Sequence, residues 1–187
     1  VGAPVTMLVA GDAAWCADLR AAEQTAGILD SLPGTILALG DLVYMRGTVE
    51  EFRDCYTPTW GRHKARTRPV PGNHEYLTAG AGPYYDYFGE LAGPSGDGYY
   101  SFTAAGWQVI ALNSNIPMER GSPQYLWLQR ELQRQAKCTL AYWHHPRFTS
   151  GPNGDNVNTG PLWELLHAAG ADVVLAGHDH VYERYLP

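Results

Sequence analysis

The stretch ADVVLAGHDHVYER, residues 171–184, passes from a short apolar segment through a glycine into two histidines that flank an aspartate. The apolar part, 171–177, is typical of a buried strand, and the histidines follow directly after its carboxyl end. In an extended chain, an i, i+2 spacing sends both imidazoles to the same side. A histidine pair alone also fits a surface turn, so the rest of the chain decides what this pair does.

Four other segments show the same order of apolar and then polar residues. The segments 5–10 and 35–40 lead directly to polar residues, and 67–76 and 138–146 contain theirs after an apolar stretch. The residues concerned are Asp12, Asp41, Asn73 with His74, and His144 with His145. Ligands in open α/β sheets bind at the carboxyl ends of the strands. Five separate segments are therefore expected to bring their polar side chains to one edge of the fold.

Apolar runs alternate with helical patterns along the chain, which predicts α/β architecture. Helices are expected over 14–32, 49–56, 124–135 and 161–170, the third with Ser122 as its N-cap and Pro123 as its first residue. Residues 98–115 are typical of a β-hairpin. The Gly- and Tyr-rich stretch 77–98 shows little periodicity and is predicted to be a loop near the site.

Length and charge exclude several classes of protein. A chain of 187 residues is long enough for one domain with a substantial core. Its net charge of −6 argues against a nucleic-acid partner, because phosphate backbones require a basic surface. No run of about 18 apolar residues is present, so no membrane span is expected. No signal peptide is visible, and the oligomeric state stays open.

Aspartate, asparagine and histidine supply oxygen and nitrogen ligands, which suit Zn, Mn or Fe better than Ca. The seven to eight candidates exceed the four ligands of one tetrahedral ion. Two ions that share a carboxylate would use them all, and such pairs, about 3.5–4 Å apart, suit phosphate ester hydrolysis. Each motif alone has a structural explanation, since a Gly-Asp pair after a strand is most often a turn or a cap. That explanation weakens because all five occur, each after its own strand.

The ordered set resembles the five sequence blocks of the calcineurin-like metallophosphoesterases. The matching blocks are GDAAW (11–15), GDLVY (40–44), GNHE (72–75), AYWH (141–144) and GHDH (177–180). The position of Tyr44, three residues after Asp41, resembles the pattern of the purple acid phosphatase branch. The stretches WGRHKARTRPVPGNHEY and YWHHPRFTSG resemble secreted bacterial members, which implies a secreted or periplasmic protein.

The resemblance implies an α/β/β/α sandwich forming a single catalytic domain over residues 1–187. Family members usually continue with strands that complete the second sheet, so this domain is expected to be a natural short form or one truncated after Pro187. Ala14 stands where the family prefers glycine, which predicts a slightly altered turn. The histidine pair that plant-type members carry after the fourth block is missing, and Asn153 or Asp155 is expected in that region.

The resemblance also implies a role for each candidate residue. Asp12, Asp41, Tyr44 and His180 match the ligands of a first ion, Fe³⁺, while Asp41, Asn73, His144 and His178 match those of a second, Zn²⁺, Mn²⁺ or Fe²⁺. Asp41 would bridge the two ions. His74 would contact the substrate phosphate and protonate the leaving group, with Glu75 orienting it. His145 and Arg147 are candidate substrate contacts, although Arg147 fits a structural role equally well.

The implied function is hydrolysis of phosphomonoesters by a metal-bound hydroxide, as in acid phosphatases, with a small phosphorylated molecule as substrate. A phosphodiesterase or nucleotide hydrolase using the same site is the alternative within enzymes. A truncated domain that binds metal or phosphate without turnover is the alternative outside them. Cys16 and Cys55 both follow segments whose aspartates would share one ion, and Cys138 begins its strand, so a disulfide is expected between Cys16 and Cys55.

Overall fold

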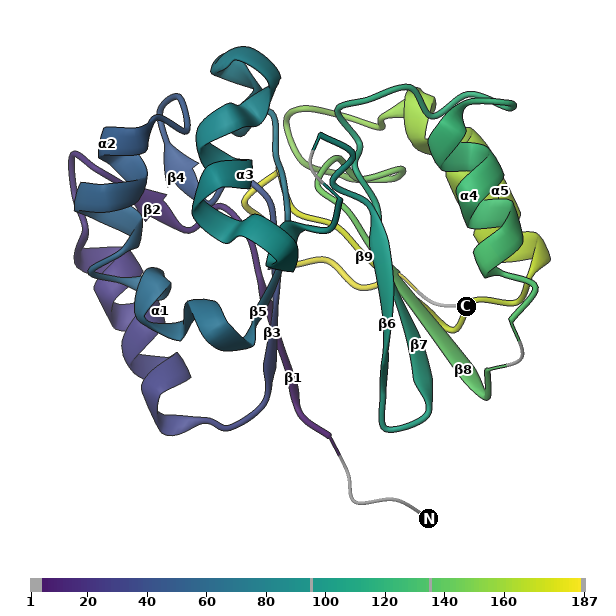
Figure 1. The fold of residues 1–187 in the computed structure, drawn as a ribbon, viewed down its shortest axis with the longest axis horizontal. Coiled ribbons are helices and arrows are strands. Elements are labelled where there is room, and N and C mark those ends of the chain that lie inside the picture. Colours follow the sequence, from purple (N-terminus) through teal and green to yellow (C-terminus); the bar gives the residue numbers. More distant parts are fainter. Residues whose placement is uncertain (1–4, 95, 135, 186–187) are drawn as a thin grey trace.

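The computed structural model describes residues 5–94, 96–134 and 136–185. Two β-sheets face each other, and helices cover the outer side of each (Figure 1). The first sheet has the order β1 (Met7–Ala10), β3 (Thr35–Leu39), β5 (Thr67–Val70), all parallel. The second has the order β6 (Tyr100–Ala104), β7 (Trp107–Ala111), β8 (Cys138–Tyr142), β9 (Val173–Leu175), antiparallel only between β6 and β7. The arrangement is the expected α/β/β/α sandwich.

Three apolar layers hold the sandwich together. Between the two sheets lie Leu37, Leu39, Val70, Val109, Ala111, Leu140 and Tyr142, all buried. A second cluster joins the first sheet to its helices, and a third joins the second sheet to the helices that cover it. Because both faces of each sheet are covered, β3 and β8 read as almost continuous apolar runs, as the sequence shows.

The helices on the first sheet are α1 (Arg20–Ser31), α2 (Val49–Glu51) and α3 (Gly82–Phe88), with a π-helical turn at Phe52–Tyr56 and a 3-10 helix at Trp60–Arg66. Those on the second are α4 (Pro123–Glu131) and α5 (Gly160–Ala168). Further 3-10 turns lie at Glu75–Leu77, Ala79–Ala81, Gly89–Ala92 and Val157–Thr159. The Ser122 Oγ accepts from the Tyr125 N–H at 3.2 Å, so the predicted N-cap is confirmed. Gln135, the last residue of that predicted helix, lies outside the described residues.

Two predictions of secondary structure are wrong. The helix expected over 14–32 begins only at Arg20, because Ala14–Trp15 form β2, which pairs in parallel with β4 (Val43–Tyr44). A partner distant in the sequence overrides the local helical pattern there. The loop expected over 77–98 contains α3, which begins with Pro83 in its first turn and buries three aromatic side chains. At seven residues it is too short to show periodicity.

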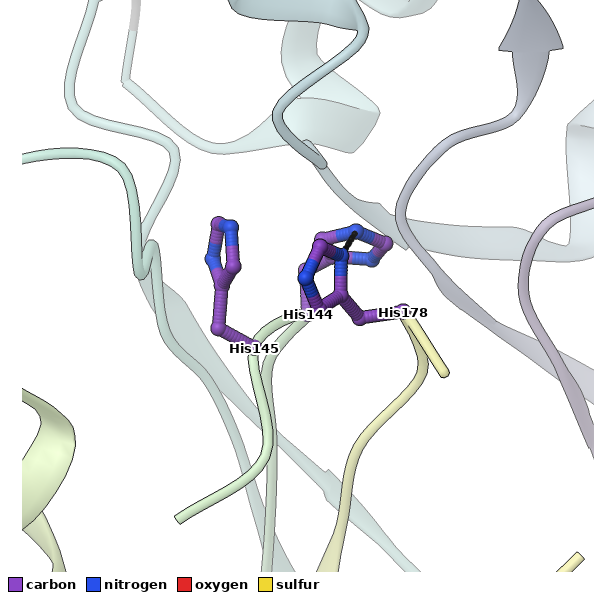
Figure 2. A group of neighbouring side chains, drawn as sticks. All are labelled: His144, His145 and His178. Atoms are coloured by element: carbon purple, nitrogen blue, oxygen red, sulfur yellow. Dashed lines mark hydrogen bonds between the residues drawn. The ribbon is translucent and has the colours of Figure 1, made fainter. Parts of the chain in front are cut away.

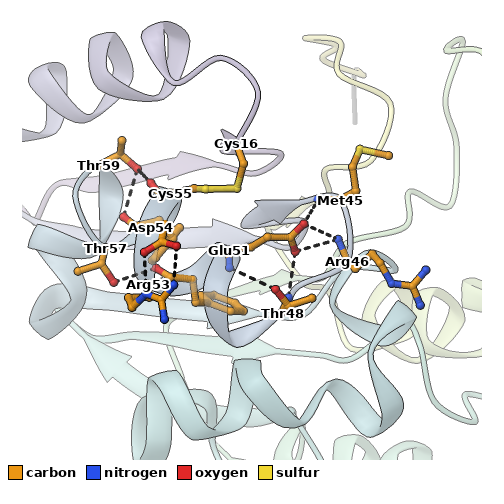
Figure 3. Close-up of a disulfide and its surroundings, with 12 residues drawn as sticks. Cys16, Met45, Arg46, Thr48, Glu51, Arg53, Asp54, Cys55, Thr57 and Thr59 are labelled. Carbon is orange, nitrogen blue, oxygen red and sulfur yellow. Dashed lines mark hydrogen bonds and ion pairs between the residues drawn. A yellow bond between two sulfur atoms is a disulfide. The ribbon is translucent and has the colours of Figure 1, made fainter.

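A disulfide joins Cys16 to Cys55, as predicted (Figure 3). The third cysteine, Cys138, is free and lies at the start of β8. The bond connects the segment after β2 to the π-helical turn. Beside it, the Glu51 carboxylate closes the loop that follows Tyr44 by accepting from the backbone N–H groups of Arg46 and Thr48, both at 3.0 Å. The cap holds the loop after Tyr44, and the disulfide ties the π-helical turn beyond that loop to the segment after β2.

Candidate metal centre

The predicted ligands come from five strand ends that meet at one edge of the sandwich. Asp12 follows β1, Asp41 follows β3, and Asn73 follows β5 in the first sheet. His144 and His178 follow β8 and β9 in the second sheet. One acidic or imidazole atom each of Asp12, Asp41 and His144 lies within 4.8 Å of the others, so the two sheets contribute to one cluster.

A first group of donors consists of Asp12, Tyr44 and His180. The Tyr44 Oη lies 2.8 Å from Asp12 Oδ1 and 2.9 Å from His180 Nε2, and those two atoms are 3.2 Å apart. Burial, with the negative charge of Asp12, raises the pKa of the Tyr44 phenol above its ordinary range. A phenolate at this position therefore requires a cation beside it.

A second group surrounds His144, which is completely buried. Its Nε2 lies 3.3 Å from Asp41 Oδ2, 3.1 Å from Asn73 Oδ1 and 3.2 Å from His178 Nδ1. Its Nδ1 lies 2.7 Å from the Leu39 carbonyl, which can only accept, so Nδ1 carries the hydrogen. The Nε2 lone pair then faces two acceptor oxygens. Only a proton or a cation resolves that arrangement, so this donor set fits a metal ion.

The ionisation of this group follows its surroundings. Burial alone would raise the pKa of Asp41, but the hydrogen bond and charge of His144 lower it below the ordinary value. Burial would lower the pKa of His144, and the Asp41 carboxylate reverses that shift and raises it. Asp41 is thus held as an anion, with a carboxylate oxygen within 4.8 Å of both Asp12 and His144.

Four of the candidate ligands have strained backbone. The φ angles are 57° at Asp12, 48° at Asp41, 78° at His178 and 54° at His180. Within the described residues, the other non-glycine positions with positive φ are Ala81 and Ala105. Each such position costs on the order of 1–3 kcal/mol, and strain of this kind concentrates at functional sites. The surrounding fold imposes these conformations at the edge where the side chains converge.

Two glycines let the strand ends approach each other. A Cβ at Gly72 would lie 2.1 Å from Asp41 Oδ1, and one at Gly40 would lie 2.6 Å from His144 Nδ1. Neither distance is possible between non-bonded atoms. The glycines of the GD and GN motifs are therefore required by close packing around Asp41 and His144.

The role predicted for Glu75 is wrong. Its buried carboxylate accepts from the backbone N–H groups of Gly72 (2.7 Å), Leu42 (2.8 Å) and Asp41 (3.0 Å), and does not orient His74. The His74 Nδ1 instead lies 2.6 Å from the Met45 carbonyl, to which it donates, and its Nε2 is 3.8 Å from Asp41 Oδ2. Glu75 starts a 3-10 turn that directs its side chain inward, under the Asp41 segment.

Glu75→Gln is expected to reduce the free energy of unfolding by about 1–3 kcal/mol, because the new NH₂ group faces backbone donors and leaves them unpaired. Burial and the charge of Asp41 raise the pKa of Glu75 to about 7, while the Gly72 N–H opposes that shift. Urea denaturation measures the effect. Glu90→Gln, at an exposed position, is the matched control and should change stability little. Equal stability of both variants would show that the Glu75 hydrogen bonds contribute nothing.

His145 lies beside the second group, and Figure 2 shows its ring next to those of His144 and His178. The ring centroids are 4.9 and 4.6 Å away, respectively. Burial, followed by the neighbouring histidines, lowers the pKa of His145 to about 3, so its imidazole is neutral. Its Nδ1 lies 2.8 Å from Ser114 Oγ. Sequence reasoning missed Ser114, although it follows the apolar run that forms β7, just as the candidate ligands follow theirs.

The remaining candidates are Arg147 and the loop residues Asn153 and Asp155. Arg147 lines a cavity of about 580 Å³ together with Asp12 and His180, and its guanidinium packs 4.4 Å above the Phe148 ring. The Asn153 backbone N–H donates to Asp179 Oδ1 at 3.0 Å, which holds this loop against the histidine segment. Asp155 instead accepts from the Thr149 N–H at 2.9 Å within its own loop.

Known proteins are similar to this chain in sequence. Purple acid phosphatase 21 of Arabidopsis thaliana is 30% identical over 98% of this chain and 46% of its own length. Purple acid phosphatase 18 of the same plant is 29% identical, over 97% and 45%. The chain therefore spans less than half the length of these relatives.

Solved structures support the fold. Purple acid phosphatase PPD1 from yellow lupin superposes with a TM-score of 0.68 at 15% identity, over 92% of this chain and 37% of that one. GAP50, described as the anchor in the inner membrane complex of Plasmodium, gives 0.67 at 17% identity, over 92% and 65%. Within residues 5–94, 96–134 and 136–185, none of the helices combines the length and the hydropathy of a membrane span. The calcineurin-like phosphoesterase family matches residues 7–182, nearly the whole chain, and the protein belongs to that family.

Proposed function

We propose that the protein is a dinuclear metal-dependent phosphoesterase that hydrolyses small phosphomonoesters, with residues 1–187 as its catalytic domain. The observation that carries the proposal is the convergence of two donor groups from five strand ends. In the first, Tyr44 Oη lies 2.8 Å from Asp12 Oδ1, and in the second, His144 Nε2 lies 3.3 Å from Asp41 Oδ2. Named purple acid phosphatases among the relatives support the same reaction class.

Each donor group would hold one ion. Asp12, Tyr44 and His180, with Asp41, would hold Fe³⁺, since a buried phenol needs a strongly charged partner to ionise. Asn73, His144 and His178, with Asp41, would hold Zn²⁺, Mn²⁺ or Fe²⁺. When bound, the two ions lower the pKa of water and neutralise charge on the phosphate. Asp41 would be the shared carboxylate, because one of its oxygens lies within 4.8 Å of both Asp12, from the first group, and His144, from the second.

The protein's own side chains then bind the phosphate and move the proton. The Met45 carbonyl holds the His74 ring through Nδ1, which leaves Nε2 directed toward the Asp41 side of the site. In its charged form, His74 would donate the Nε2 proton to the departing ester oxygen. His145 and Arg147 are the proposed contacts to the phosphate oxygens. Glu75 supports the reaction indirectly by holding the Asp41 backbone.

The disulfide supports a location outside the reducing cytoplasm, because such bonds persist in oxidising compartments. We therefore propose a secreted or periplasmic protein.

Metal analysis combined with chromogenic substrates tests the function. Aerobically purified protein is expected to contain two metal equivalents and to hydrolyse an aryl phosphomonoester faster than the corresponding phosphodiester. A chelator should abolish turnover, and added metal should restore it. Faster cleavage of diesters would favour the phosphodiesterase alternative. Bound metal without turnover on either ester would favour a binding domain instead.

Tyr44→Phe is expected to abolish a visible absorption band of the aerobically purified protein. A phenolate bound to ferric iron absorbs visible light by charge transfer, whereas a loop tyrosine does not. The band should be recorded together with the iron content. Tyr182→Phe is the matched control, since Tyr182 is 92% exposed and two residues beyond His180. If iron is present and Tyr44→Phe retains the band, Tyr44 is not its ligand.

A further inference from the structure

Ser114 connects the end of β7 to the candidate metal centre through His145. The Ser114 Oγ accepts from the His145 backbone N–H at 3.1 Å and lies 2.8 Å from His145 Nδ1. The serine is only 6% exposed. Two contacts from one buried hydroxyl fix both the backbone and the ring of a residue 31 positions away.

The segment around Ser114 is itself held firmly. The backbone N–H and carbonyl of the preceding Asn113 bond to the Gln124 side chain at 2.7 and 2.9 Å. On the other side, the Asn115 amide donates to the Pro71 carbonyl at 3.0 Å. The Trp143 Nε1 donates to the His145 carbonyl at 2.7 Å. Neither partner in the Ser114–His145 contact is therefore free to move away.

The hydroxyl hydrogen of Ser114 selects one tautomer of His145. A buried hydroxyl needs an acceptor for its hydrogen, because a buried donor without a partner destabilises the fold. Among the described residues, His145 Nδ1 is the one acceptor within hydrogen-bond distance. The hydroxyl therefore donates to Nδ1, which must present its lone pair. In the neutral imidazole, the ring hydrogen then lies on Nε2.

The neighbouring His144 has the opposite tautomer. Its Nδ1 faces the Leu39 carbonyl and must carry the hydrogen, which leaves the Nε2 lone pair for a cation. Ring nitrogens of His144, His145 and His178 lie within 4.8 Å of one another, so proximity alone would allow His145 to be a third ligand. The two adjacent histidines differ in the partner of Nδ1, which is a carbonyl oxygen for His144 and a hydroxyl for His145, and they therefore carry opposite tautomers. His144 is an acceptor toward the site, and His145 is a donor.

We propose that Ser114 is a positioning residue that holds His145 as the Nε2–H tautomer, so that His145 donates a hydrogen bond to a substrate phosphate oxygen and does not ligate a metal. The inference rests on the proposed function, and it specifies the tautomer of His145, one of the proposed contacts to the phosphate. The side chain at 145 is predicted to need a donor at the Nε2 position. Ser114 itself touches neither substrate nor ion.

The tautomer can be measured without any activity. In zinc-reconstituted protein labelled with ¹⁵N histidine, His145 is expected to show a protonated Nε2 and an unprotonated Nδ1, with His145→Gln used to assign its signals. Ser114→Ala should shift this population toward the Nδ1–H form. A wild-type His145 with its hydrogen on Nδ1 would overturn the proposal. A protein that binds no metal and has no turnover would refute the proposed function instead, and the two failures are thus distinguishable.

Kinetics and metal content test the consequence. Ser114→Ala is expected to lower kcat/KM by about 3–10-fold, the value of one hydrogen bond. In a His145→Ala background, the same change should have no further effect. His145→Gln, which can place an amide donor near the Nε2 position, should retain more activity than His145→Asn. All these variants should keep the wild-type metal content.

Ser101→Ala is the matched control, since its partly buried hydroxyl bonds to Glu131 on another element. It should leave kcat/KM unchanged. If His145→Ala loses one equivalent of metal, His145 is a ligand and the proposal is wrong. The comparison of His145→Gln with His145→Asn remains decisive even if Ser114→Ala fails to fold, because it leaves Ser114 in place.

Discussion

Asp41→Asn is expected to lose at least one bound ion and to reduce turnover by about 10²–10³-fold or more, the scale seen when a key electrostatic group is removed. Asp41 is 2% exposed, and its Oδ2 lies 3.3 Å from His144 Nε2. Asparagine keeps an oxygen that can accept from the His74 backbone N–H, as Asp41 Oδ1 does at 2.9 Å, so the fold should survive. What disappears is the negative charge that two cations would share.

Elemental analysis and steady-state kinetics on the same preparation measure the effect, with thermal unfolding to confirm the fold. Asp86→Asn, on the exposed side of α3, is the matched control and should keep metal and turnover. Full metal content with normal turnover in Asp41→Asn would refute the bridging assignment. Loss of turnover with both ions retained would place Asp41 in catalysis but outside the shared position.

His74→Ala is expected to keep both ions and to lower turnover by about 10²–10⁴-fold, the range for loss of a general acid. The Met45 carbonyl fixes the His74 ring, whose Nε2 lies 3.8 Å from Asp41 Oδ2 and which packs edge-on against the Tyr44 ring at a centroid distance of 4.5 Å. Removing the ring therefore removes a proton donor while leaving the predicted ligands in place. His167→Ala, at an exposed position of α5, is the matched control.

The dependence on the leaving group separates two roles for His74. Esters whose leaving groups are good need no proton, so the loss in His74→Ala should shrink as the leaving group improves. A series of aryl phosphates compared with an alkyl phosphate measures this slope. An equal loss across the series would assign His74 to phosphate binding. Loss of metal in the variant would show that it helps to hold the ions.

Much of the fold could be predicted because its signals are local. Apolar runs of strand length, Gly-Asp turns and the Ser122 cap depend on neighbours within a few residues. The short helix α3 was not predicted because seven residues give too little periodicity, although Pro83 marks its start. The pair β2 and β4 was not predicted for another reason. Its strands are two residues each and exist only because the segments after β1 and β3 lie side by side.

For the site, the order of residues along the chain is enough to place the donor side chains after the strands, and hence to predict the donor types and the family. What those side chains face depends on how distant segments pack in three dimensions. The Glu75 carboxylate accepts from the backbone around Asp41, 34 positions away. The His74 ring, which Glu75 was predicted to orient, is held by the Met45 carbonyl instead. The tautomers of His144 and His145 depend on the Leu39 carbonyl and the Ser114 hydroxyl, 105 and 31 positions away. A hydrogen-bond partner is selected by distance and direction in space, and two histidines adjacent in the sequence can therefore be given opposite chemical roles.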